Sequence, residues 1–118
     1  MMGESSLPAS SSEIFIAVIL YEASSNELPN QPLYEESFVL IKAASLDEAR
    51  AKALSYAQQS ETSYRNERDE TITWSLKRII DVSPILSDFF EEGAELYSRH
   101  FRNYEAYCAF EPMLLGEL

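Results

Sequence analysis

The spacing of apolar residues changes from every second position to about every third or fourth within residues 34–57. The run YEESFVLI at 34–41 predicts a strand, and SLDEARAKALSYA at 45–57 predicts a helix. Ser45 and Glu48 have the spacing of a capping box at the start of that helix. Because a helix and a sheet each bury one apolar surface, we expect the helix to pack on a sheet.

Residues 13–23 predict an earlier strand that is apolar on both faces. Its two rows are Ile14, Ile16, Val18 and Leu20 on one face, and Phe15, Ala17, Ile19 and Tyr21 on the other. A strand of this kind is normally central in its sheet and covered on both sides. One helix covers a single face, so we expect the C-terminal part of the chain or a second copy to cover the other.

Four further elements complete the predicted fold. Residues 33–42 predict a strand that is an antiparallel neighbour of the first. One face of this strand carries Tyr34, Glu36, Phe38, Leu40 and Lys42. The other face carries Glu35, Val39 and Ile41. Residues 71–82 alternate, with Ile72, Trp74, Leu76, Ile80 and Val82 on one face. Residues 95–102 predict a fourth strand with Tyr97 and Phe101 facing inward, and 103–109 predict a helical tail.

The sequence therefore predicts an α+β fold: an antiparallel sheet of about four strands in ββαββ order, one helix packed on a face, and a short C-terminal helical tail. Residues 1–12 are Ser-rich and without periodicity, and we expect a disordered tail there. Residues 13–118 are expected to form a single α+β domain.

The net charge and the cysteine content limit the classes of partner and the compartment that we expect. With 20 acidic and 9 basic residues, the formal net charge is −11. This charge disfavours binding to nucleic acid and to anionic membranes, and it favours a basic partner. Cys108 is the one cysteine and residues 1–12 do not read as a signal peptide, so we expect a cytoplasmic protein.

No catalytic residues, cofactor or metal site are predicted. One His and one Cys could supply only two ligands to a Cys/His zinc site, and three isolated glycines cannot build a phosphate-binding loop. Four basic residues could form a patch for an anion or for a partner's carboxylates: Lys77, Arg99, His100 and Arg102. The alternative is that these cations neutralise Glu35, Glu36 and Glu95 within the domain.

The C-terminal third is rich in aromatic residues. Tyr97, Phe101, Tyr104 and Tyr107 would form an association surface if they are exposed. The same residues are candidates to cover the second face of the first strand.

Several segments of the chain occur together in a known family. They are EESFVLIKAASLDEARAKAL at 35–54, Tyr64 and Asn66 in YRNE, Trp74 in ITWSLKRIIDV, and Glu95, Tyr97 and Ser98 in ELYSR. As a set they resemble the DUF4288-type domains of unknown function, a family of small bacterial domains. The resemblance implies a compact α+β domain in the cytosol and transfers no activity to any residue.

The leading functional hypothesis is a non-enzymatic protein-interaction module that forms a homodimer. A second is an acidic immunity-type inhibitor of a basic toxin or enzyme, based on charge and size. A third is a small-molecule enzyme or ligand-binding domain that uses the region of Glu36, Lys77 and Arg99.

Overall fold

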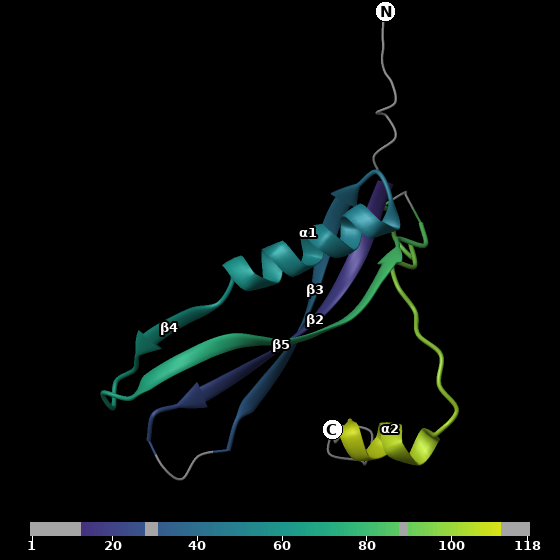
Figure 1. Ribbon diagram of the computed structural model, residues 1–118. Helices are drawn as coiled ribbons and strands as arrows, with labels where there is room; N and C mark the ends of the chain where they lie inside the picture. Colours follow the sequence, from purple (N-terminus) through teal and green to yellow (C-terminus); the bar gives the residue numbers. More distant parts are fainter. Residues whose placement is uncertain (1–12, 28–30, 88–89, 112–118) are drawn as a thin grey trace, which may run out of the picture.

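The computed structural model describes residues 13–27, 31–87 and 90–111. The described chain forms an α+β fold with a twisted, four-stranded antiparallel sheet and two helices (Figure 1). The elements are β2 (Glu13–Ser25), β3 (Leu33–Ala43), α1 (Leu46–Gln59), β4 (Thr62–Arg65), β5 (Thr71–Pro84) and α2 (Tyr104–Phe110). The strand order is β3-β2-β5-β4, so β2 and β5 are the central strands and β3 and β4 are the edges.

Helix α1 covers one face of the sheet through a row of alanines. Ser45 caps the helix by accepting a hydrogen bond from the Glu48 N–H at 3.1 Å. Glu48 in turn accepts from the N–H of Ala44 at 2.7 Å, one residue before the position that a standard capping box uses. The residues of α1 buried against the sheet are Ala49, Ala53 and Ala57, and their small side chains let the helix lie close to β2.

The main core lies between α1 and the sheet. Its sheet side consists of Phe15, Ala17, Ile19, Tyr21, Ile41, Ala43 and Val82. Val39, Leu46, Trp74, Leu76 and Ile79 pack around these residues and are partly buried. The helix-facing row of β2 is therefore buried as the sequence predicted.

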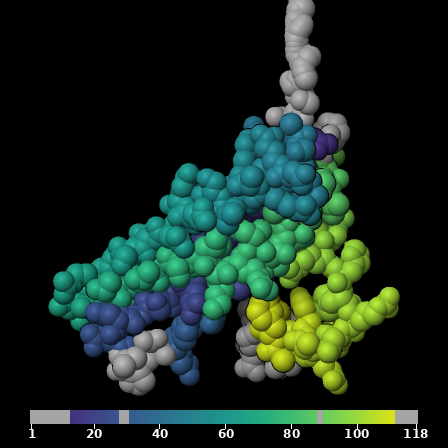
Figure 2. Space-filling model, viewed as in Figure 1, coloured from purple at the N-terminus to yellow at the C-terminus, as the bar shows by residue number. Residues whose placement is uncertain are grey.

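The second face of β2 is covered by the C-terminal segment that follows β5. Val18 is 0% exposed although α1 lies on the opposite side of the sheet. The cross-strand neighbours of Val18 are Phe38 and Asp81, and Tyr97 contacts both of them. Tyr97 therefore lies over Val18, and the prediction that β2 is buried on both sides is confirmed at its centre. Figure 2 shows α1 along one side of the sheet and the C-terminal segment on the other.

The prediction of a fourth strand at residues 95–102 was wrong. These residues are not part of the sheet, and they cross its second face as irregular chain. The fourth strand is instead β4, which follows α1 directly and pairs with β5. The predicted ββαββ order is thus not matched strand for strand. The helical tail is present as α2, where the Asn103 side chain caps the helix by accepting from the Ala106 N–H at 3.0 Å.

Two register shifts in the β2–β5 ladder alter the predicted alternation of β5. They fall between Val18 and Ile19 and between Leu20 and Tyr21. Because each bulge inserts a residue into β5, Ile79 takes the core-facing position that simple alternation assigns to Ile80. The predicted disordered tail at residues 1–12 lies outside the described residues.

We expect Ala53→Leu to destabilise the domain by about 1–3 kcal/mol, because a larger side chain overpacks the helix–sheet contact. Ala51→Leu in the same helix is the matched control, since Ala51 is exposed and Ala53 is fully buried. Urea unfolding monitored by circular dichroism measures both. Equal midpoints for the two variants would contradict the close helix–sheet packing.

Candidate functional site

The second face of the sheet exposes large apolar side chains along strand β3. Tyr34, Phe38 and Leu40 are 51%, 62% and 47% exposed, although their neighbours in β2 are mostly buried. Glu36 and Lys42 lie on the same face of β3, at either end of the Phe38–Leu40 pair. We call these five residues the β3 row. Tyr97 covers one margin of it through an edge-on contact with the Phe38 ring, with ring centroids 5.8 Å apart.

A carboxylate anchors the C-terminal segment on this face. The Tyr97 hydroxyl donates to Asp81 Oδ2 at 2.8 Å, and the Ser83 hydroxyl donates to the same oxygen at 2.9 Å. Burial alone would raise the pKa of Asp81, but the hydrogen bonds from Tyr97 and Ser83 outweigh it and the pKa lies below its ordinary 3.8. Burial and the bond to Asp81 raise the pKa of Tyr97 above 10.0.

The predicted basic residues do not form one patch. Lys77 lies 3.3 Å from Glu22, and Arg99 lies 3.9 Å from Glu36. Residues 95–102 do not pair with β5, so no ladder places Arg99 beside Lys77. Arg99 pairs with one of the three carboxylates named in the alternative, whereas Lys77 pairs with Glu22, which was not among them.

His100 and Arg102 follow in the same exposed segment. Within the described chain, neither forms an ion pair. His100 and Arg99 line a surface hollow of about 430 Å³ with Phe101, Asn103, Ala106 and Tyr107, whereas Lys77 and Glu36 do not.

The predicted aromatic residues divide into two groups. Tyr97 is half-buried against the sheet, whereas Phe101, Tyr104 and Tyr107 are exposed. Phe101 stacks on Tyr107, with ring centroids 4.7 Å apart, and so folds the segment back onto α2. No residue of α2 is buried. Figure 1 places α2 on the side of the sheet away from α1.

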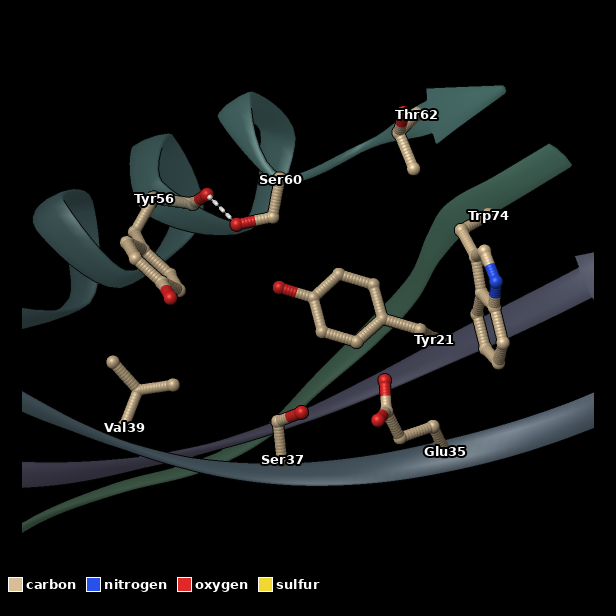
Figure 3. Close-up of a pocket in the computed structure, with 8 residues that line it drawn as sticks. All are labelled: Tyr21, Glu35, Ser37, Val39, Tyr56, Ser60, Thr62 and Trp74. Atoms are coloured by element: carbon tan, nitrogen blue, oxygen red, sulfur yellow. Dashed lines mark hydrogen bonds between the residues drawn. The ribbon is translucent and has the colours of Figure 1, made fainter. Parts of the chain in front are cut away.

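A pocket of about 370 Å³ opens on the other face, between the C-terminal end of α1 and the sheet (Figure 3). We call it the α1–sheet pocket. Its lining residues are Tyr21, Glu35, Ser37, Val39, Tyr56, Ser60, Thr62 and Trp74. They come from five elements or their junctions: β2, β3, the end of α1, β4 and β5. Three aromatic side chains therefore surround a space that also holds a carboxylate and several hydroxyls.

Two polar groups in this pocket lack partners. Tyr21 is 6% exposed, and no residue of the described chain forms a hydrogen bond with its hydroxyl, which points into the pocket in Figure 3. A hydroxyl that has no protein partner and points into a pocket is a position where a ligand or water would bind. Glu35 directs its carboxylate toward the Tyr21 ring, and none of the described cations pairs with it.

The sequence patterns placed Tyr21 and Trp74 in apolar rows of their strands and did not predict this pocket. The available signal was Glu35, an acidic residue on the same face of its strand as Val39 and Ile41. An acidic residue in such a row indicates a place where the row opens to solvent, and Glu35 lines the pocket and is exposed.

Among residues 13–27, 31–87 and 90–111, no three His, Cys, Asp or Glu side chains lie close enough to hold a metal ion together. No helix of that part of the chain has the length and apolar character to cross a bilayer.

We expect Tyr97→Phe to cost about 1 kcal/mol of stability, because it removes one hydrogen bond to a half-buried carboxylate. The pKa of Asp81 should rise in this variant. A lowered carboxyl pKa contributes stability that is complete above the unfolded value and is lost as the pH falls through the folded value. The loss should therefore be largest near neutral pH and shrink below the ordinary carboxyl pKa of 3.8.

Thermal unfolding of both proteins between acidic and neutral pH, with carbon-detected NMR titration of Asp81, tests this expectation. A difference in stability that is independent of pH, with an unchanged Asp81 titration, would contradict the anchoring role of Tyr97.

The chain matches the sequence profile of one known protein family. The profile described as a domain of unknown function (DUF4288) matches residues 14–98, which include the sheet apart from Glu13, all of α1, and Tyr97. No curated protein and no solved structure matches the chain. The match covers well over half of the chain and ends just beyond the residue that covers the second face of β2. The chain therefore belongs to the DUF4288 family.

Proposed function

We propose that this domain is a non-enzymatic protein-interaction module of the cytoplasm that forms a homodimer through strand β3. The observation that carries the proposal is the β3 row, an exposed apolar surface on an edge strand next to a buried central strand. Large exposed apolar surfaces with charged margins are typical of association sites.

The outer edge of β3 is available for strand pairing. The Ile85 N–H donates to the Ile14 carbonyl at 2.9 Å, so the backbone of Ile14 faces β5 and not β3. Its partner in β3 is Lys42, whose backbone must then point away from β2. The Lys42 carbonyl accepts from Lys52 Nζ at 2.7 Å, which agrees with that direction. By alternation, Tyr34, Glu36, Phe38 and Leu40 also present their backbone groups to the outer edge.

The β3 row is self-complementary in charge. In an antiparallel pair of two β3 strands, residues opposite one another must have the same orientation, so a two-fold axis passes through one residue. With the axis at Val39, Glu36 lies opposite the partner's Lys42, and Phe38 lies opposite the partner's Leu40. With the axis at Phe38, Glu36 would lie opposite the partner's Leu40 instead. Opposite charges and apolar pairs across strands are stabilising, which favours the axis at Val39.

We expect sedimentation at micromolar concentration to give a species with twice the mass of one chain. Lys42→Glu should convert it to monomer, because Glu36 would then face a second carboxylate in the partner. The double variant Glu36→Lys with Lys42→Glu should restore the dimer, since the opposite charges are exchanged. Melting curves of all variants show whether each chain is folded.

A matched control is Lys77→Glu, because Lys77 is exposed to a similar degree but lies on the central strand β5, away from the proposed interface. It should leave the dimer intact. A wild-type protein that sediments as monomer, or a dimer unaffected by Lys42→Glu, would contradict pairing through β3.

A further inference from the structure

We propose that the α1–sheet pocket binds the ammonium or guanidinium group of an organic cation. The pocket opens on the α1 face of the sheet and the β3 row lies on the other face, while Val39, at the proposed dimer axis, is shared by both. The proposal depends on the charge of the pocket, its aromatic walls and its unpartnered hydroxyl, in that order.

The one charged residue that lines the pocket is acidic. Glu35 supplies a carboxylate, and no Lys, Arg or His is among the lining residues. The last turn of α1 carries no basic residue, and this helix ends at the pocket with Tyr56 and Ser60. Because the C-terminal end of a helix carries a partial negative charge, it adds to the attraction for a cation. An anionic ligand would meet repulsion from both groups.

The aromatic residues that line the pocket also favour a cation over a neutral ligand. Tyr21, Tyr56 and Trp74 line the pocket, and Figure 3 shows the Tyr21 ring between the other two, with its hydroxyl directed toward α1. A cation near the face of an aromatic ring is attracted by the ring's electron density, most strongly in the case of Trp. A carboxylate combined with aromatic rings therefore distinguishes a cation from a neutral molecule of the same shape.

The hydroxyl of Tyr21 indicates that the cation carries N–H groups. Tyr21 as a whole is 6% exposed, and its hydroxyl has no partner in the described chain and points into the pocket. Ser37 and Glu35 lie on β3 beside it and offer further oxygen acceptors. A primary ammonium or a guanidinium could donate to these oxygens, whereas a quaternary ammonium has no proton to donate. The geometry thus favours an alkylammonium or alkylguanidinium group.

Two sources could supply such a group: a free small amine, or a Lys or Arg side chain on a protein. The cavity volume of about 370 Å³ is large enough for the charged group and a short alkyl chain. Both sources present the same chemistry to Glu35 and Tyr21, so they are distinguished by experiment.

Trp74 provides a direct reporter, because it is the one tryptophan of the chain and lines the pocket. Its fluorescence is followed while n-butylammonium is added at constant ionic strength and neutral pH, with 1-butanol as the neutral control. We expect a saturable change with the ammonium and none with the alcohol. Glu35→Gln should weaken binding at least about tenfold, because a charge-assisted hydrogen bond is lost.

Glu67→Gln is the matched control, since Glu67 is an exposed carboxylate that lies neither in the pocket nor in the proposed dimer contact. It should leave butylammonium affinity unchanged. An absent or non-saturable response in the wild-type protein would overturn the proposal. Equal loss in the two variants, or equal binding of 1-butanol, would also overturn it.

Tyr21→Phe separates binding from folding. Because the hydroxyl has no partner in the described chain, its removal should leave the melting temperature unchanged or slightly higher, whereas loss of a bonded buried hydroxyl would lower it. Butylammonium affinity should fall, and the weak binding of tetramethylammonium should not change. A marked drop in melting temperature with unaltered butylammonium affinity would contradict the role assigned to the Tyr21 hydroxyl.

The source of the cation is then tested with Nα-acetyl-lysine methylamide and a short lysine-containing peptide. Peptide affinity well above that of butylammonium identifies a protein side chain as the ligand. Equal affinities identify a free amine. Either result supports the site, provided that Glu35→Gln weakens the binding.

Discussion

The burial of β2 on both faces is the constraint on which the rest of the structure depends. On one face the alanine row of α1 comes close enough to seal Phe15 and Ile19. On the other, Tyr97 lies over Val18 and is held by Asp81. Because one helix cannot cover two faces, the chain must return across the sheet after β5. The path of the C-terminal segment is therefore a consequence of the amino-acid pattern of the first strand.

The elements predicted correctly from the sequence were those with a strong period or cap. Residues 13–23 alternate over a long run, and Ser45 with Glu48 marks the start of α1. Strand β4 was missed because its four residues are too few to show alternation. Its hairpin to β5 is held by the Asn66 side chain, which accepts from the N–H groups of Arg68 and Glu70 at 2.9 Å. Residues 95–102 alternate like a strand, but they follow the surface of the sheet without joining a ladder.

The candidate sites were harder to predict because they depend on how elements meet. Arg99 was recognised as a surface cation, but only its position beside Glu36 shows that it has an internal partner. Tyr21 and Trp74 occupy core-facing positions of β2 and β5, and their sequence environment is that of buried residues. The pocket forms because the C-terminal end of α1 leaves the sheet above them. The apolar pattern of one strand cannot show where the end of a helix lies relative to the sheet.

Strand β3 has a different role on each side. Glu35, Ser37 and Val39 line the α1–sheet pocket, whereas Glu36, Phe38 and Leu40 form the exposed row. Because side chains alternate along β3, residues of the proposed ligand site and of the proposed association surface are neighbours in sequence but lie on opposite faces of the sheet. In the proposed dimer the axis passes through Val39, so the two pockets would lie near each other on one face of a continuous sheet.

The position of Tyr97 over Val18 also has a consequence during translation. Val18 is translated before Tyr97, so one apolar side of the growing polypeptide has no shield until Tyr97 has left the ribosome. Contacts between distant parts of a chain form late and slowly. Nascent molecules of this domain should therefore be prone to aggregate and should benefit from chaperones that bind exposed apolar strands.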